Sequence, residues 1–192
     1  MAQGQLNSCR LLVIGGSAGS LEVLLQVLPY LRADMPFPIV LVMHRRSAAE
    51  STLEELLASR TTLQVREAGD KDRLRPGFLY VAPGDYHLLV ERNGRLSLDV
   101  SEKMHYCRPA IDATFDTAAD AFGSSLACIL LSGANADGAD GLRKAHALGA
   151  RVFVQDPATA DVTAMPEAGL AAVPGATVLL PQSMAALIND LG

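Results

Sequence analysis

The stretch Leu11-Leu12-Val13-Ile14-Gly15-Gly16-Ser17-Ala18-Gly19 joins a short aliphatic run to a glycine-rich turn, and an amphipathic segment over residues 21–31 follows it. Four aliphatic residues in a row predict a buried strand, and the amphipathic segment predicts a helix. The turn between them fits G-x-S-x-G, in which small residues permit a tight bend that holds the serine oxygen clear of the backbone. This stretch therefore predicts an α/β fold with one exposed serine.

Two interpretations of this turn are open. Ser17 is a candidate nucleophile, and free N–H groups at the start of the following helix could hold an oxyanion. A glycine turn between strand and helix is also common in α/β proteins of every function, and it could cradle a phosphate without any chemistry. The dinucleotide fingerprint G-x-G-x-x-G would need glycine at Ser17 and Ser20, so NAD binding is disfavoured.

Further apolar runs along the chain resemble the one at residues 11–14. They predict strands over 39–43, 126–131, 151–154 and 177–180. Helical patterns alternate with them over 21–31, 52–59, 111–122, 142–148 and 184–191. This alternation predicts a doubly wound, mainly parallel β-sheet with helices on both faces, which is a Rossmann-like three-layer α/β sandwich.

The segment over residues 76–100 has a different pattern. Short apolar runs over 78–82, 87–90 and 96–100 are separated by Pro83-Gly84-Asp85 and by Asn93-Gly94. Because Asn-Gly between two short strands favours a hairpin, we expect an antiparallel β excursion from the parallel sheet here.

The composition predicts a single domain. Of the 192 residues, 49% are hydrophobic and 19% are charged, which suffices for one substantial core. We expect this domain to span residues 1–192, with its core over about 9–191. The formal net charge of −5 argues against a nucleic-acid partner.

The chain offers no sequence signal for a membrane, a disulfide framework or a metal. No apolar run approaches the roughly 20 residues that cross a bilayer, and no signal-peptide core is present at the start. We therefore expect a cytoplasmic protein without direct membrane insertion. Cys9, Cys107 and Cys128 are far apart and form no C-x-x-C pair, so neither disulfides nor zinc are predicted.

Three polar residues follow strands that should share one edge of the sheet. In an open parallel sheet, ligands bind beyond the carboxyl ends of the strands. Ser17 follows the first strand, His44 follows the strand over 39–43, and Asp137 lies in the loop after the strand over 126–131. A serine nucleophile needs a base to accept its proton and a carboxylate to orient that base. These three residues supply those types on one rim.

Each partner of the serine also has a plainer interpretation. His44 could simply cap a strand end, and Asp137 could be the N-cap of the next helix, which is a common position for aspartate. Asp140 and Asp156 are rival acids. An ordinary α/β-hydrolase is disfavoured, because that fold places the acid before the histidine in the chain.

The remaining histidines have weaker claims. His87 precedes a short strand, and His146 lies within a predicted helix, so both fit structural positions. His105 lies in an irregular loop over residues 102–109 and is a candidate for substrate contact. Arg45 and Arg46 beside His44 could attract an acidic partner, although a solvated edge is the simpler interpretation.

Further motifs occur in a characteristic order: Ala82-Pro83-Gly84 followed by His87, Arg108-Pro109 with Asp112 and Phe115, Leu131-Ser132-Gly133 through Asp137-Gly138-Ala139 and Gly141, and Gln155-Asp156-Pro157 followed by Met165-Pro166. Together with the serine turn, they resemble the catalytic domain of the CheB-type chemotaxis protein-glutamate methylesterases. The resemblance covers nearly the whole chain.

This resemblance implies that Ser17, His44 and Asp137 form a catalytic triad. The triad would hydrolyse glutamate methyl esters on chemoreceptor cytoplasmic helices through an acyl-serine and release methanol, and some members of the family also deamidate receptor glutamines. No cofactor or metal is implied. The candidates for the oxyanion and substrate contacts are Ala18, Gly19, Arg108 and Ala134.

The chain departs from the family pattern near the predicted nucleophile. Ala18 stands where a threonine is usual, Ser20 where a glycine is usual, and Ala134-Asn135 where Met-Gly is usual. These changes predict an altered substrate fit or rate. They also leave open a catalytically weakened regulatory or binding module of the same fold, or an esterase for small molecules.

The sequence before the first predicted strand is short. About ten residues precede it, whereas a domain needs on the order of 50 or more. We therefore expect a stand-alone catalytic domain without the receiver domain that the family usually carries. A separate regulatory protein could take the place of that domain.

Overall fold

The main sheet of the computed structural model has seven strands that pair only in parallel; the structure describes residues 8–45 and 52–192. The strands are β1 (Leu11–Gly16), β2 (Ile39–Met43), β3 (Gln64–Glu67), β4 (Phe78–Val81), β7 (Leu126–Leu130), β8 (Arg151–Gln155) and β9 (Thr177–Leu179). Their order across the sheet is β3-β4-β2-β1-β7-β8-β9, so β1 lies at its centre. The order reverses at β1, which makes the sheet doubly wound.

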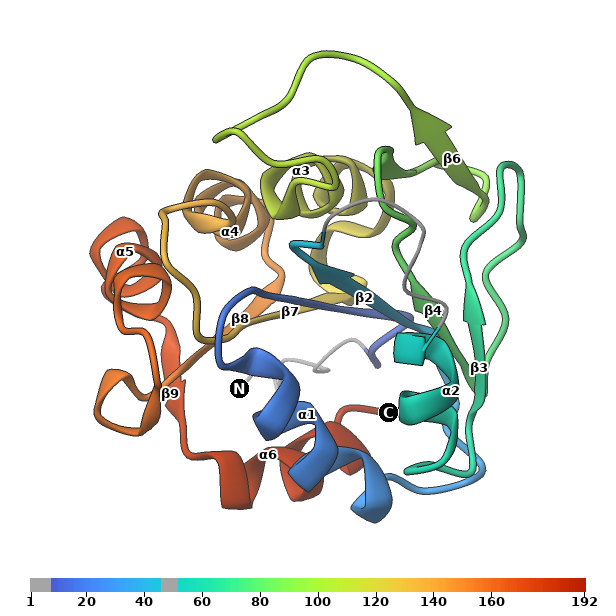
Figure 1. The fold of residues 1–192 in the computed structure, drawn as a ribbon, viewed down its shortest axis with the longest axis horizontal. Helices are drawn as coiled ribbons and strands as arrows, with labels where there is room; N and C mark the ends of the chain where they lie inside the picture. Colours follow the sequence, from blue (N-terminus) through green and yellow to red (C-terminus); the bar gives the residue numbers. More distant parts are fainter. Residues whose placement is uncertain (1–7, 46–51) are drawn as a thin grey trace, which may run out of the picture.

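Within the described residues, six α-helices connect and cover the strands (Figure 1). They are α1 (Ser20–Val27), α2 (Thr52–Ala58), α3 (Ile111–Phe122), α4 (Ala139–Ala147), α5 (Ala164–Ala172) and α6 (Pro181–Asn189). Three short 3-10 helices are η1 (Leu28–Tyr30), η2 (Gly123–Ser125) and η3 (Pro157–Thr159). A separate antiparallel ribbon of β5 (His87–Val90) and β6 (Leu96–Asp99) lies beside α3.

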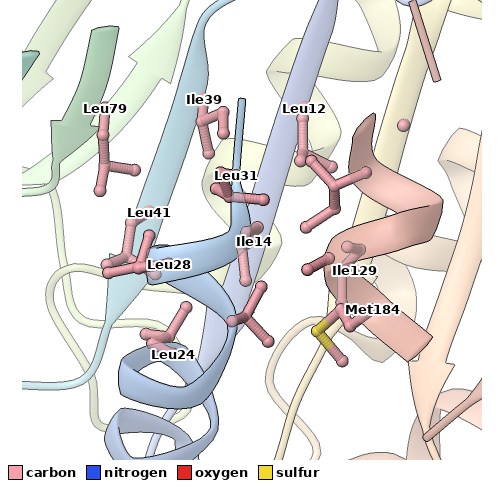
Figure 2. Packing of buried hydrophobic residues seen from close by; sticks show 14 of the residues in the cluster. Leu12, Ile14, Leu24, Leu28, Leu31, Ile39, Leu41, Leu79, Ile129 and Met184 are labelled. Carbon is pink, nitrogen blue, oxygen red and sulfur yellow. The ribbon is translucent and has the colours of Figure 1, made fainter. Parts of the chain in front are cut away.

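Alternation of side chains along the strands divides the core into two layers. Leu12 and Ile14 of β1 pack in the layer that includes residues of α1, α2 and α6. Leu11 and Val13 pack in the layer that includes α3, α4 and the β5–β6 ribbon. Figure 2 shows the first layer, in which side chains of the helices meet aliphatic side chains of the central strands. Both faces of the sheet are therefore covered, and its central strands β1, β2 and β7 are buried and apolar along their whole length, as parallel strands covered on both faces require.

The predicted fold class is confirmed, but the middle of the chain needs a correction. The segment over 78–82 was expected in the antiparallel excursion, whereas β4 pairs in parallel with β2 and β3 inside the main sheet. Three of its four side chains are buried, as a strand inside the sheet requires. Only β5 and β6 form the predicted hairpin around Asn93-Gly94.

Two further elements were not predicted. Strand β3 exposes most of its side chains at the sheet edge and therefore has no apolar run. Helix α5 contains Pro166 and Gly169, which hide its helical pattern. Gly169 is required by packing, because a Cβ there would lie 2.8 Å from Leu130 Cδ2. The helix expected over 21–31 ends at Val27 and continues as the 3-10 turn η1, which contains a proline.

No helix in the described part of the chain has the length and apolar character that would let it span a bilayer.

Candidate active site

The turn that carries Ser17, the candidate nucleophile, begins where β1 ends. The Ser17 N–H donates to the Ser132 carbonyl (2.9 Å), which ties the turn to the segment after β7. The Ser17 carbonyl accepts from the N–H of Ser20 (3.1 Å) and from its Oγ (2.6 Å). Gly19 has φ +81°, a left-handed conformation that glycine adopts without steric cost. Ser20, where the family pattern has glycine, therefore braces the turn from the first residue of α1, while Ser17 stays partly exposed.

Gly133 lies against the other side of the candidate nucleophile. A Cβ at this position would be 2.5 Å from Met165 Cε and 3.0 Å from Ser17 Cβ. Glycine is thus the residue that lets the loop after β7 pass between Met165 and Ser17. Its N–H donates to the Val162 carbonyl and its carbonyl accepts from the Met165 N–H, which fixes the loop in this position.

His44 directly follows β2, and its N–H donates to the Gly16 carbonyl at 3.3 Å. Since Gly16 and Met43 are register partners, Ser17 and His44 are the first residues beyond two paired strand ends. The His44 Nε2 lies 2.6 Å from Asp137 Oδ2. No hydrogen bond joins the Ser17 hydroxyl to the His44 ring in the described residues, but catalytic contacts are often long without substrate.

Asp137 is fully buried, and its carboxylate occupies the N-terminus of α3. Oδ2 accepts from the Ile111 N–H (2.7 Å) and Oδ1 accepts from the Asp112 N–H (2.9 Å). Burial opposes ionisation, but the hydrogen bond from His44 and those from the two helix N–H groups outweigh it and lower the pKa of Asp137. The alternative that Asp137 caps the helix after it is wrong, because Gly138 is the N-cap of α4.

Asp112 completes an exchange between two helices. It lies in the first turn of α3, and its Oδ1 accepts from the Gly141 N–H (2.7 Å) in the first turn of α4. Asp137, just before α4, therefore accepts from N–H groups at the start of α3, and Asp112 of α3 accepts from an N–H group at the start of α4. Burial, together with the charge of Asp137, raises the pKa of Asp112.

The same carboxylate also holds a histidine of the loop before α3. His105 Nε2 lies 3.0 Å from Asp112 Oδ2. The ligand atoms of His105, Asp112 and Asp137 lie within 4.8 Å of one another, so they are the group in the described chain that could approach a metal ion. Their oxygens already accept hydrogen bonds from N–H groups and imidazole rings, so the arrangement is accounted for without a metal.

The candidate oxyanion donors lie on the exposed side of the serine turn. Among the hydrogen bonds of the described residues, none uses the N–H of Ala18, Gly19 or Ala134. Ala18 and Ala134 are exposed and Gly19 is partly exposed. These N–H groups are thus free to donate to a ligand oxygen. In place of the family's Met-Gly, Asn135 turns the loop, because its Oδ1 accepts from the Asp137 N–H (3.1 Å).

A cavity of about 470 Å³ opens beside His44. It is lined by His44, Arg45, Asp85, Lys103, Tyr106, Cys107 and Arg108. Arg108, a predicted substrate contact, faces this cavity, but its Nη1 also donates to the carbonyls of Val100 and Ser101 (2.9 Å each). Arg108 therefore shapes the cavity wall, whatever it contacts in a substrate.

The other polar residues considered from the sequence lie away from this arrangement. His87 is buried, where its ring pairs with the Ala110 N–H and the Glu102 carbonyl. His146 is exposed on α4, Asp140 pairs with Arg143, and Asp156 accepts from the Ala158 N–H. In the described part of the chain, none of them forms a hydrogen bond or ion pair with the His44 side chain, whose partner is Asp137.

Sequence reasoning missed the contacts of Asp112 and Asn135 and the place of Tyr106 at the cavity. Asp112 is recognisable as an acidic residue in the first turn of a predicted helix, which is a favourable position near the helix dipole. Its link to α4 depends on how two helices pack, and no local pattern indicates that.

Comparisons with known proteins agree with the fold and show the family. The sequence model of a family described as CheB methylesterase matches residues 12–188. A chain from Leptospira interrogans serovar copenhageni is 35% identical over 180 residues, which cover 94% of this chain and 93% of that one. A protein-glutamate methylesterase/protein-glutamine glutaminase of Thermotoga maritima is 38% identical over 163 residues, which cover 83% of this chain but 47% of that protein.

A solved structure is also similar. The crystal structure of the Thermotoga maritima CheB methylesterase catalytic domain superimposes with a TM-score of 0.91 at 34% identity, and the match covers 96% of this chain and all of that one. The chain thus corresponds to the catalytic part of that enzyme and spans about half the length of the full Thermotoga relative.

Proposed function

The chain belongs to the CheB methylesterase family, and on that premise we propose that it hydrolyses glutamate methyl esters on the cytoplasmic helices of chemoreceptors, with Ser17, His44 and Asp137 as its triad. The observation that carries the proposal is the 2.6 Å contact between His44 Nε2 and the buried Asp137 carboxylate, at the strand end next to Ser17. The names of several relatives include protein-glutamine glutaminase as a second activity of the same proteins.

The contact with Asp137 supports one tautomer of His44. An ionised carboxylate only accepts hydrogen bonds, so the imidazole proton lies on Nε2 and the lone pair lies on Nδ1. Nδ1 is therefore the atom that takes the proton of the Ser17 hydroxyl. The two N–H donors of α3 keep Asp137 ionised, and they thereby keep this tautomer in place.

The reaction then follows acyl-transfer chemistry. Ser17 Oγ attacks the ester carbonyl while its proton passes to His44 Nδ1, and the tetrahedral oxyanion accepts from the N–H groups of Ala18 and Gly19. The C–O bond to the methoxy group breaks, and Nδ1–H returns the proton to form methanol. Water then attacks the acyl-serine with the same base, which leaves a glutamate side chain and free Ser17.

The same steps accommodate an amide substrate. With a glutamine side chain the leaving group is ammonia, and His44 Nδ1 supplies its proton. The glutaminase activity in the relatives' names therefore needs no further catalytic residue in this site.

Methanol release from a methylated receptor fragment tests the proposal. We expect release by the parent protein and its loss, by at least 10³-fold, in Ser17→Ala. The matched control is Ser59→Ala, at the far end of α2, which should leave the rate unchanged because Ser59 is exposed and its Oγ donates only to the Leu56 carbonyl.

Three results would contradict parts of the proposal. An inactive parent protein points to a binding or regulatory module. Equal rates in the parent and in Ser17→Ala remove Ser17 as the nucleophile. Turnover of short esters without turnover of the receptor fragment identifies an esterase for small molecules.

A further inference from the structure

The turn Met104-His105-Tyr106-Cys107 lies at the cavity beside His44, which its second half, Tyr106 and Cys107, lines. Met104 and Cys107 form an antiparallel bridge, with the Cys107 N–H donating to the Met104 carbonyl at 2.8 Å. The two central residues have positive φ, +49° at His105 and +63° at Tyr106. Such turns ordinarily use Gly, Asn or Asp, because bulkier residues are strained in this conformation. A His-Tyr pair here is therefore held by its surroundings.

Three side-chain contacts hold the turn in place. His105 Nε2 lies 3.0 Å from Asp112 Oδ2, inside the helix pair that positions Asp137. Asn135 Nδ2, in the loop of the catalytic acid, lies 3.6 Å from Cys107 Sγ. Arg108 Nη1 donates to the Val100 and Ser101 carbonyls and closes the base of the segment. The turn is thus fixed relative to the triad.

The result of this arrangement is a tyrosine that contacts almost nothing of its own chain. Tyr106 is 97% exposed, and it lines the same cavity as His44. Its neighbour Met104 is 40% exposed, and Lys103, also on the cavity wall, makes no ion pair among the described residues. An exposed tyrosine beside an exposed methionine matches the composition of protein interfaces, in which both residue types are enriched.

We propose that this turn is the docking element for the helical segment that carries the ester, with Tyr106 as the specificity-determining contact and His105 as the positioning residue. The proposal rests on the proposed function, since the occupant is the protein substrate itself. Tyr106 and His44 line the same cavity. When the ester side chain of a substrate helix reaches His44, neighbouring residues of that helix therefore meet Tyr106. Lys103, on the same cavity wall, can pair with a glutamate carboxylate of that segment, which is the group that ester hydrolysis leaves there.

Tyr106→Asn tests the contact. Asparagine tolerates a left-handed backbone, so this variant removes the ring without adding strain. For a methylated receptor fragment, we expect KM to rise about tenfold with kcat within twofold of the parent. For a minimal blocked glutamate methyl ester, which has no flanking helix, kcat/KM should not change. Tyr30→Asn is the control, because Tyr30 is also exposed (73%) but lies after α1, away from the cavity.

Two variants of His105 test its positioning role. The amide of His105→Gln can reach Asp112 from the position of Nε2, whereas the shorter His105→Asn keeps the backbone preference but not the contact. We expect His105→Asn to raise KM for the fragment as Tyr106→Asn does, and His105→Gln to restore it to near the parent value.

The outcomes separate this inference from the proposed function. If the parent releases no methanol from either substrate, the proposed function fails and the inference fails with it. If the parent is active but KM for the fragment is unchanged in Tyr106→Asn, the docking role alone is wrong. An equal loss on the fragment and the minimal ester would show that the turn supports the fold or the triad and does not bind the substrate helix. Equal KM values in the two His105 variants would remove the positioning role.

Discussion

Asp112 and Asp137 are buried carboxylates that link α3 and α4 beside His44, and their surroundings shift their pKa values in opposite directions. Asp137 accepts from His44 and from two N–H groups of α3, which lower its pKa against the effect of burial. Burial and the nearby Asp137 charge raise the pKa of Asp112. Ionised Asp137 thus stabilises the folded state, whereas ionised Asp112 destabilises it.

This difference predicts opposite pH dependences for two variants. Asp137 has a folded pKa below its unfolded value, so its stabilisation is present above the unfolded pKa, about 3.9, and is lost as pH falls through the folded pKa. We therefore expect Asp137→Asn to be destabilised by about 2 kcal/mol at pH 7, with a deficit that shrinks in acid. The free energy of unfolding in urea, measured from pH 3 to pH 7.5, checks this.

Asp112→Asn should show the reverse trend. Its raised pKa means that ionised Asp112 opposes folding above the folded pKa, and that this penalty is absent below the unfolded pKa. Relative to the parent, the stability of Asp112→Asn should therefore improve as pH rises above about 4. If both variants followed the same trend with pH, the opposite shifts assigned to the two carboxyl groups would be wrong.

At the residue scale, the proximity of Ser17, His44 and Asp137 can be predicted from the sequence, but the residues that hold them in position cannot. Ser17, His44 and Asp137 each follow a predicted strand, and carboxyl ends of parallel strands share one rim, so their proximity is predictable. The role of Asp112 is not, because it follows from α3 packing against α4. The catalytic roles themselves stay a prediction until the variants are assayed.

At the scale of elements, the loop after β7 packs against Ser17, the candidate nucleophile, from outside the turn that carries it. Gly133 lies between Met165 and Ser17, with room for hydrogen only. Because Met165 is fully buried at the start of α5, it has little space to retreat. A larger residue at position 133 should therefore push Ser17 away from its present position.

Gly133→Ala is accordingly expected to damage catalysis more than stability. A displacement of Ser17 approaching 1 Å would lower kcat for methanol release by about 100-fold, while the thermal midpoint falls by only a few degrees. Gly175→Ala is the control, since a Cβ there meets no atom within 4 Å. A Gly133→Ala variant with parental kcat would show that the loop yields and that its packing does not set the position of Ser17.

Element prediction succeeded where burial is continuous and failed where it is not. Strands β1, β2, β7 and β8 are buried on both faces and appear in the sequence as apolar runs. Strand β3 lies at an edge and exposes most of its side chains, so its sequence lacks that signal. Strand β4 was recognised as a strand, but its pairing is set by the tertiary position of β2, which hairpin cues nearby cannot indicate.

At the scale of the whole molecule, one sheet separates two apolar layers that share the same strands. In β7, Ile129 belongs to the layer that includes α1 and α6, and Leu130 to the layer that includes α3 and α4. Both side chains are fully buried. Neither layer can lose its packing without exposing one face of the strands that carry the site, so the layers should unfold together.

We therefore expect Ile129→Ala and Leu130→Ala each to lower the free energy of unfolding by about 2–5 kcal/mol, in a single transition with an unchanged dependence on denaturant. Far-ultraviolet circular dichroism and tyrosine fluorescence should give coincident curves, because the chain has four tyrosines and no tryptophan, and Tyr80 packs in the same layer as Leu130. If Leu130→Ala moved the fluorescence transition but left part of the dichroism signal at the parental midpoint, the layers would be separate folding units. The rim that joins Ser17, His44 and Asp137 would then lack a common support, because Asp137 is held by α3 on one face while the turn of Ser17 leads into α1 on the other.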